Sequence, residues 1–438
     1  MKILIVAHAF PPHNASGSVR VGKLAEYLCE QGHDVRVITA EPLPYPRTLT
    51  TTVAPERVIA TPWFDPVAIL KKLRRPDAAA DTAKADGDSG GAYRRWLAAA
   101  LGIPDLQIGW YLYAIRAGRS LFRHWQPDII YASALPFTGH MVARRLSRLA
   151  GVPWVAEFRD QFADNPYSNL PAWRAPLDRW IERRVLATAA ACVTVSDPIA
   201  EYLSRQHGKR TLVALNGYDE RDYPADAPRT PDRHAPVTIL YTGNIYPGRR
   251  DPSALFAAIA GLGAEANSVQ VIFHGDDLRG VAALAERHGV SKNVTVLPSI
   301  PYRRSLAEQR AADVLLLLLW NDPREAGVYT GKLFEYIGAG RPILSVGAER
   351  GKAAELLQSR SLGLASASPE RIGAALRAWI AEKRANGAIA GPPGESRRGL
   401  SRQDQFAAVG SLLHDLVRAR IPAGAPHEAP SATLPGHS

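Results

Sequence analysis

The sequence predicts an α/β protein built from two Rossmann-like, doubly wound domains that face each other across a cleft. Short apolar segments alternate with helical patterns along most of the chain, which is typical of parallel sheets covered by helices on both faces. This alternation stops between Glu220 and Pro236, where Asp, Arg and Pro dominate, and then starts again. The length of 438 residues is also roughly twice that of a comfortable single core.

The first domain, residues 1–218, opens with a βαβ pattern. An apolar strand is expected at 3–7, and a loop from His8 to Gly17 leads into a helix with apolar residues at helical spacing. We expect Ser18 to cap this helix and Gly32 to end it. Further strands of this domain are expected at 33–39, 128–133, 153–158, 191–195 and 212–215.

The rest of the chain divides into a linker at 219–236, a second domain at 237–400, a C-terminal helix at 401–420 and a tail at 421–438. Strands of the second domain are expected at 237–242, 269–273, 294–297, 314–319, 342–346 and 362–365. Two segments lack periodicity and are rich in small or turn-forming residues. We expect a flexible excursion at 77–91 and a disordered tail at 421–438.

The composition is that of a soluble globular protein, with 46% hydrophobic and 22% charged residues. Cys29 and Cys192 each lie inside an apolar periodic segment, so we expect no disulfide and a reducing, cytoplasmic compartment. The N-terminal apolar run is too short for a signal peptide, and no stretch approaches the roughly 18 to 20 apolar residues that cross a bilayer. The sequence contains no recognisable metal-binding motif.

The net charge of +11 favours anionic partners, which include phosphorylated small molecules, acidic lipid headgroups and nucleic acid. RNA-stacking motifs are missing, so nucleic acid is not expected. Basic and aromatic residues interleave in the first domain, either as a peripheral face for an anionic membrane surface or as a solvated basic face with core tryptophans. These residues are Trp63, Phe64, Lys71, Lys72, Arg74, Arg75, Arg94, Arg95, Trp96, Trp110, Tyr111, Arg116, Arg119, Arg123 and Trp125.

The stretch from Gly327 to Pro342 follows the apolar run Val314 to Leu319 and opens a predicted helix. On that helix Lys332 and Glu335 share a face, which would present a cation for phosphate beside a carboxylate for two neighbouring hydroxyls. A nucleotide sugar offers both groups. An ordinary surface ion pair explains the spacing equally well.

Two glycine-bearing loops follow the first predicted strand of each domain. The loop ending at Gly17 leads to a helix N-terminus, where unpaired N–H groups and the helix dipole favour anions, although a plain tight turn would look the same. The loop after 237–242 carries Gly243 and then Arg249 and Arg250, whose guanidinium groups suit a pyrophosphate or simply face solvent. Neither loop has the G-x-G-x-x-G pattern of dinucleotide-binding proteins.

Charged residues end the predicted strand at 153–158. Arg159 and Asp160 follow it, at the strand end where ligands bind in open parallel sheets. Asp160 could orient or deprotonate an acceptor hydroxyl, or it could pair with Arg159.

Four stretches together resemble the family 4 retaining glycosyltransferases of the GT-B fold, particularly the branch that makes bacterial polysaccharides and lipid-linked glycans. They are Phe10-Pro-Pro with Gly17-Ser18-x-Arg20 and Gly32-His33-x-Val35; Glu157-Phe-Arg-Asp160; Leu215-Asn-Gly-Tyr-Asp219; and Thr330-Gly-Lys-Leu-Phe-Glu-Tyr336 with Gly340-Arg-Pro342. They extend over nearly the whole chain.

This resemblance implies a metal-independent transfer of sugar from a nucleotide-sugar donor to a glycan or lipid-linked acceptor, with no further cofactor. It implies that Glu335 holds the ribose and that Lys332 with Arg249 or Arg250 holds the diphosphate, near Gly243, Thr330 and Gly331. Gly17 would approach the donor from the opposite domain, and Arg159 and Asp160 would lie on the acceptor side.

The chain departs from the family pattern at two places. Gly327 stands in the region where the family often carries a first glutamate, and Asp160 stands where many members have histidine. A nucleotide-sugar epimerase or hydrolase of the same fold remains an alternative, as does a non-catalytic protein that binds a membrane surface or nucleic acid.

Overall fold

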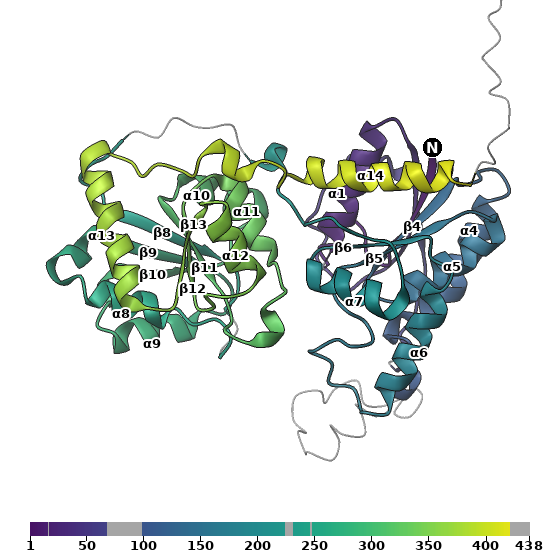
Figure 1. The fold of residues 1–438 in the computed structure, drawn as a ribbon, viewed down its shortest axis with the longest axis horizontal. Coiled ribbons are helices and arrows are strands. Elements are labelled where there is room, and N and C mark those ends of the chain that lie inside the picture. The colour runs from purple at the N-terminus through teal and green to yellow at the C-terminus, as the bar shows by residue number, and fades with distance from the viewer. Residues whose placement is uncertain (16, 68–98, 224–230, 246–247, 421–438) are drawn as a thin grey trace, which may run out of the picture.

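The computed structural model describes residues 1–15, 17–67, 99–223, 231–245 and 248–420 (Figure 1). The predicted excursion at 77–91 and the predicted tail at 421–438 lie outside these residues. The described chain forms two parallel sheets, each covered by helices, which confirms the predicted fold class.

The first sheet has seven parallel strands in the order β3-β2-β1-β4-β5-β6-β7. They are β1 (Lys2–Val6), β2 (Asp34–Ala40), β3 (Val58–Thr61), β4 (Ile129–Ala134), β5 (Trp154–Phe158), β6 (Ala191–Thr194) and β7 (Thr211–Val213). All but β3 correspond to predicted strands. β3 is short and mostly half-exposed, so its sequence lacks the continuous apolar run that marks the central strands.

The second sheet has six strands in the order β10-β9-β8-β11-β12-β13. They are β8 (Val237–Thr242), β9 (Val269–His274), β10 (Val294–Leu297), β11 (Val314–Leu318), β12 (Ile343–Val346) and β13 (Gly363–Ser366). All six correspond to predicted strands. The run of leucines in β11 is completely buried because this central strand has helices on both faces.

Helices cover both faces of each sheet (Figure 1). On the first sheet, α1 (Ser18–Glu30) and α14 (Arg402–Arg418) pack on one face, and α4 (Tyr111–Leu121), α5 (Thr138–Ala150), α6 (Arg174–Leu186) and α7 (Asp197–His207) pack on the other. On the second sheet, α8 (Ser253–Ala260), α9 (Arg279–Arg287) and α13 (Pro369–Asn386) oppose α10 (Tyr302–Ala311), α11 (Gly331–Ala339) and α12 (Lys352–Ser359).

Helix α14 returns from the second sheet to the first, where it lies beside α1 (Figure 1). Phe406, Val409, Leu412 and Leu413 are buried against the face of the first sheet that α1 also covers. The chain therefore crosses between the two sheets twice. The first crossing begins at Leu215, after β7, and leads to the second sheet; the second crossing leads back and ends at Arg402, the first residue of α14.

Helix α1 begins directly at Ser18. Gly17 adopts a left-handed conformation with φ of 82°, and the helix start has no side-chain capping hydrogen bond. The prediction that Ser18 caps the helix is therefore wrong, because Ser18 is already its first residue and is fully buried. Gly32, with φ of 77°, follows the helix end as predicted.

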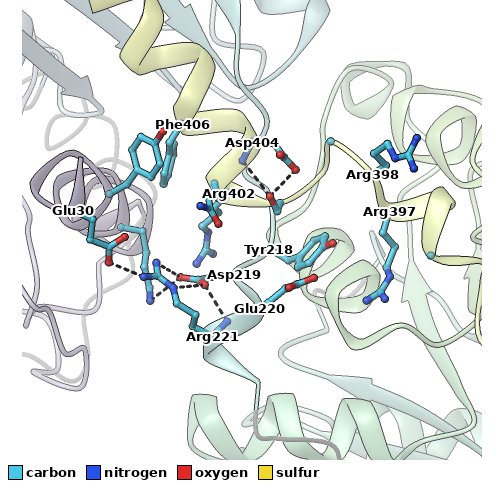
Figure 2. A pocket seen from close by; sticks show the side chains of 16 residues that line it. Glu30, Tyr218, Asp219, Glu220, Arg221, Arg397, Arg398, Arg402, Asp404 and Phe406 are labelled. Carbon is cyan, nitrogen blue, oxygen red and sulfur yellow. Dashed lines mark hydrogen bonds and ion pairs between the residues drawn. The ribbon is translucent and has the colours of Figure 1, made fainter. Parts of the chain in front are cut away.

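The two crossings lie against each other between the sheets. The Tyr218 N–H donates to the Leu400 carbonyl at 3.3 Å, and the Arg402 N–H donates to the Tyr218 carbonyl at 2.7 Å. Gly217 allows this contact, because a Cβ there would come within 2.7 Å of the Arg402 backbone. A cavity of about 380 Å³ lies beside the crossings, lined by Tyr218, Arg402 and other residues shown in Figure 2.

Candidate active site

A cavity of about 820 Å³ lies between the two sheets, and residues of both line it. In doubly wound sheets ligands bind beyond the carboxyl ends of the strands, at the point where the strand order reverses. That point lies between β1 and β4 in the first sheet and between β8 and β11 in the second. The loops that follow β1 and β11 both contribute to the cavity wall, through Gly17 and Gly327.

Five of the predicted site residues line this cavity. Gly17, Arg159 and Asp160 come from the first half, and Gly331 and Glu335 come from the second. The predicted cleft between the two domains therefore exists in the structure and contains residues from both predicted motifs.

Helix α11 carries Lys332 just inside its N-terminus. Thr330 occupies the N-cap position, and the Lys332 ammonium donates to the Tyr241 hydroxyl at 2.8 Å while lying 4.1 Å from the centre of the Tyr241 ring. Burial, together with the positive charge of Arg250, lowers the pKa of Lys332 to about 7. Lys332 is therefore a desolvated cation and not one half of an ordinary surface ion pair.

Gly243 makes room for this lysine. A Cβ at position 243 would lie 2.6 Å from the Lys332 ammonium nitrogen, and its φ of 114° is one that other residues rarely adopt. The predicted Gly243 thus contributes to the site by permitting the position of Lys332.

Glu335 lies one helical turn further along α11. The Gln309 side chain, which is fully buried, donates to a Glu335 carboxylate oxygen at 3.3 Å. Burial raises the pKa of Glu335, while the Gln309 hydrogen bond and the charges of Arg402 and Lys332 oppose this shift. Gln309 thus holds the Glu335 carboxylate on one side, and Glu335 lines the large cavity on the other.

Arg249 and Arg250 lie in a smaller cavity of about 130 Å³, whose wall also includes Thr330. The Arg249 guanidinium lies 4.8 Å from the centre of the Trp320 ring, and Arg250 donates to the Asn244 carbonyl at 3.3 Å. The arginine pair thus lies beside the large cavity and not in its wall, although the charge of Arg250 reaches Lys332.

Arg159 lies against the loop after β1. It donates to the Ala134 carbonyl at 2.8 Å and to the Leu135 carbonyl at 3.2 Å. A Cβ on Gly17 would lie only 1.5 Å from an Arg159 nitrogen, so glycine is needed at position 17 for this arrangement. The structure thus brings together two residues that are far apart in the sequence.

Asp160 reaches the solvent of the cavity. Partial desolvation raises the pKa of its carboxyl, the nearby charge of Glu325 raises it further, and Arg159 lowers it. Because Arg159 gives its hydrogen bonds to main-chain carbonyls, the alternative in which Asp160 serves only as its ion-pair partner is not supported.

Glu157, which precedes this pair on β5, has a structural role instead. It is fully buried, and Arg20 and the Tyr131 hydroxyl donate to it at 2.8 Å and 2.7 Å. Burial alone would raise the pKa of Glu157, but Arg20 and the hydrogen bonds hold it below its usual value. Arg20 also donates to the Leu215 carbonyl at 2.8 Å, so this pair ties α1 to the start of the first crossing.

Several contacts in and beside the large cavity had not been predicted from the sequence. The Tyr167 hydroxyl, from the loop after β5, donates to the carboxylate of Glu325 in the loop before α11. Gly327 lies against Pro198 of α7, and Lys352 of α12 lies 3.8 Å from Asp197. These pairs are more than a hundred residues apart in the sequence, and no local pattern marks them.

The described residues contain no group of three or more His, Cys, Asp or Glu side chains arranged to hold a metal ion. Within the same ranges, no helix has the length and apolar character needed to span a bilayer.

Residues 17–219 match the family model of the glycosyl transferase 4-like domain. No curated protein matches the sequence. Among solved structures, sucrose-phosphate synthase from Thermosynechococcus elongatus superposes with a TM-score of 0.57 at 14% identity, over 95% of this chain and 99% of that one.

Two further structures are similar over the whole length. Anabaena HepE in complex with UDP gives a TM-score of 0.58 at 13% identity, covering 96% of this chain and 100% of that chain. The lipopolysaccharide outer core galactosyltransferase WaaB gives 0.56 at 11% identity, covering 95% and 99%. At these identities the structural likeness shows the fold.

Proposed function

We propose that this chain, which has the GT-B fold and matches the glycosyl transferase 4-like domain at residues 17–219, is a glycosyltransferase. In this proposal it transfers a sugar from a nucleotide-sugar donor to a lipid-linked or otherwise membrane-associated acceptor, with retention at the anomeric carbon. The reaction would belong to the synthesis of a cell-surface glycan.

The observation that carries the proposal is the placement of Lys332 and Glu335 on helix α11, where Glu335 lines the large cavity and Lys332 lies against Tyr241 beside it. A buried ammonium beside a helix N-terminus suits a diphosphate, because cation and dipole act together on the negative charge. The Glu335 carboxylate, one turn away, suits the two hydroxyls of a ribose. Anabaena HepE has been solved with UDP and with UDP-glucose, which makes uridine nucleotides the first ligands to test.

Mechanistically, the anomeric carbon gains positive character as the diphosphate leaves, and cations stabilise the departing charge. Lys332, Arg249 and Arg250 would supply this stabilisation without a metal ion. Asp160 lines the large cavity from the first half, and its raised pKa suits a group that accepts a proton from an acceptor hydroxyl. Arg159, beside Gly17, would hold the donor from the same side.

A membrane-associated acceptor is supported by the surface of α4, α5 and α6. The only acidic residues of these helices, Asp178 and Glu182, are buried, whereas Trp180 is 58% exposed and Trp173, just before α6, is 44% exposed. The exposed basic residues of these helices are Arg116, Arg119, Arg145, Arg148, Arg179, Arg183 and Arg184. Among these arginines, Arg179 forms an ion pair with Asp164 of the loop after β5 at 2.6 Å. Exposed tryptophan beside an excess of exposed arginine suits an anionic lipid surface.

This face differs from the one predicted from the sequence. Trp110 and Trp125 are buried core residues that donate to Thr61 and Asp34, so they cannot form part of a membrane face. Lys71, Lys72, Arg74, Arg75, Arg94, Arg95 and Trp96 lie outside the described residues.

Thermal shift measurements with nucleoside diphosphates and their sugars test the proposal. Uridine, guanosine and adenosine ligands should be compared, and at least one should raise the melting temperature of the wild-type protein. Lys332→Ala and Glu335→Ala should abolish this shift and the transfer to a lipid-linked acceptor. If no nucleotide sugar stabilises the wild-type protein, or if both variants transfer sugar normally, the proposed function is wrong.

A further inference from the structure

The hydrogen bond between Tyr167 and Glu325 joins the two halves of the molecule across the active-site cavity. Tyr167 lines the large cavity, in a loop held by the hydrogen bond from its N–H to Asn165 at 2.9 Å. Glu325 ends a short turn in which the Asp322 carboxylate accepts from the Arg324 N–H at 2.9 Å. Both side chains are therefore presented by locally braced loops.

Glu325 lies where the phosphate-binding cations meet the acceptor side. It shares the smaller cavity with Arg249, Arg250 and Thr330. Its charge also raises the pKa of Asp160, which belongs to the opposite half. A single carboxylate thus stands between the cations that suit a diphosphate and the carboxylate that faces the acceptor.

The transferred sugar has to occupy this region. In a nucleotide sugar it is bonded to the second phosphate, and during transfer it must also reach the acceptor hydroxyl. The glycine at position 327 cannot supply a polar group for it. A Cβ at this position would come within 2.8 Å of the Pro198 ring, so no larger side chain fits between the two halves here.

We propose that Glu325 binds the transferred sugar, with its carboxylate accepting hydrogen bonds from the sugar hydroxyls. Tyr167 positions this carboxylate from the opposite half by donating to it. The proposal rests on the function proposed above.

A charge-assisted hydrogen bond contributes about 1.5–3 kcal/mol, which corresponds to roughly 10- to 100-fold in affinity. Loss of the Glu325 charge should therefore weaken the binding of a nucleotide sugar by about this factor. The binding of the matching nucleoside diphosphate should stay within about twofold of wild type, because it has no sugar to contact Glu325.

Calorimetric titration of UDP and UDP-glucose, and of the guanosine and adenosine pairs, into three variants tests the proposal. Glu325→Gln removes the charge but keeps an oxygen that can accept from Tyr167. Tyr167→Phe breaks the contact between the halves but keeps the carboxylate. Glu395→Gln, which removes an exposed carboxylate that lines neither the large nor the smaller cavity, serves as the control.

The proposal expects Glu325→Gln to lose sugar-dependent affinity, Tyr167→Phe to keep most of it and Glu395→Gln to keep all of it. If Tyr167→Phe loses as much sugar affinity as Glu325→Gln, or more, the pair only connects the two halves and the proposal fails. Equal losses for the diphosphate and its sugar in Glu325→Gln would also overturn it. Failure of the proposed function is distinct, because the wild-type protein would then bind no nucleotide at all.

Discussion

At the scale of single residues, we expect Lys332 to make binding of the proposed donor dependent on pH. Burial lowers the pKa of this lysine from 10.5 to about 7, so the free protein carries the proton on Lys332 only part of the time near neutrality. The unfolded chain binds that proton more tightly, and Lys332 therefore destabilises the folded state most below pH 7 and progressively less up to its unfolded pKa. A bound diphosphate would favour the charged form again.

The resulting prediction is that binding of a nucleoside diphosphate takes up a proton and weakens as the pH rises from 7 to 9. Titration calorimetry in two buffers of different ionisation enthalpy at pH 7.5 measures the uptake directly. Lys332→Met should bind on the order of 10- to 100-fold more weakly, with no proton uptake from this site. Uptake that is unchanged in Lys332→Met would assign the proton to another group.

A second prediction at this scale concerns Gly327. Gly327→Ala places a Cβ within 2.8 Å of the Pro198 ring and should push the two halves apart at the cavity, which slows sugar transfer by about 10-fold or more. Gly280→Ala is the control, since a Cβ at that position meets no atom within 4 Å. Replacing Pro198 by alanine in the Gly327→Ala background should recover part of the rate, and an absence of recovery would rule out the steric explanation.

At the scale of elements, α14 is part of the first domain although it follows the second in sequence. Phe406 is 1% exposed and Leu413 is fully buried, both against the first sheet. Phe406→Ala or Leu413→Ala should lower the free energy of unfolding by about 2–5 kcal/mol, as measured by urea denaturation. Ser411→Ala, on the exposed side of the same helix, should change it by less than about 0.5 kcal/mol. Equal effects of all three variants would contradict this packing role.

Helix α6 carries the prediction for membrane binding. The triple variant Trp180→Ser, Arg183→Ala, Arg184→Ala should bind vesicles that contain phosphatidylglycerol at least about 10-fold more weakly, since each arginine near an anionic surface contributes about 1 kcal/mol. Arg371→Ala with Arg377→Ala removes two exposed charges from α13 of the second half and should leave vesicle binding unchanged. Cosedimentation measures both, and equal weakening by the two sets would mean that overall charge, and not α6, governs binding.

The strands were the features that the sequence predicted best. Central strands such as β4 and β11 are buried on both faces and therefore appear as continuous apolar runs, whereas the half-exposed β3 does not and was missed. The sequence did not distinguish buried from exposed tryptophans. Trp110 and Trp180 belong to similarly basic, aromatic segments, and only the packing of α4 and α6 decides that the first is buried and the second exposed.

In the candidate site, relations set by the local sequence could be predicted and relations set by tertiary packing could not. Lys332 and Glu335 were predicted to share a helix face because one helix turn separates them in the sequence. Tyr167 and Glu325 were missed because their contact depends on how the two halves meet. Gly17 and Arg159 were each predicted separately, but their close approach was not. Gly17 follows β1 and Arg159 follows β5, and these strands are separated by β4 in the sheet, so the contact depends on the strand order and not on the local sequence.

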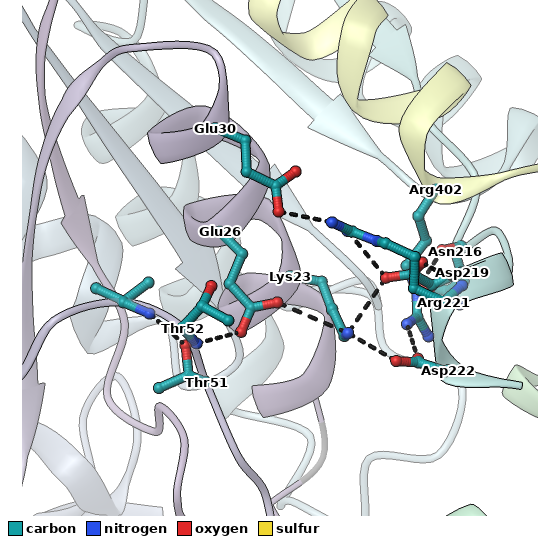
Figure 3. A network of polar contacts seen from close by, with 11 residues as sticks. Lys23, Glu26, Glu30, Thr51, Thr52, Asn216, Asp219, Arg221, Asp222 and Arg402 are labelled. Atoms are coloured by element: carbon teal, nitrogen blue, oxygen red, sulfur yellow. Dashed lines mark hydrogen bonds and ion pairs between the residues drawn. The ribbon is translucent and has the colours of Figure 1, made fainter. Parts of the chain in front are cut away.

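At the scale of the whole molecule, a polar network joins α1 to the two segments in which the chain crosses between the halves (Figure 3). The Lys23 ammonium of α1 lies 2.7 Å from Asp222 and 3.2 Å from Asp219 of the first crossing. Arg402 of the second crossing lies 3.3 Å from the other Asp222 oxygen. Although burial alone would lower the pKa of Lys23, these carboxylates raise it, which shows that the folded state favours the charged lysine.

Asp222 is thus the residue through which α1 and both crossings are connected. Asp222→Ala would leave Arg402 without this carboxylate, and the charge of Arg402 also acts on Glu335 in the cavity. Because the ion pairs are mostly shielded from water, their loss should cost about 2–3 kcal/mol, between the values for exposed and fully buried pairs. The two halves should then be held less firmly in one orientation.

We therefore expect Asp222→Ala to have a lower melting temperature and, by small-angle scattering, a larger radius of gyration than the wild-type protein without ligand. Arg205→Ala breaks an ion pair with Glu201 whose side chains are 75% and 68% exposed, and it should change stability by less than about 1 kcal/mol and leave the scattering unchanged. A nucleotide that binds both halves should bring the Asp222→Ala scattering back toward that of the wild type. If Asp222→Ala scatters and melts like the wild-type protein, the orientation of the halves is set by the packing of Gly217 against Arg402 and not by this network.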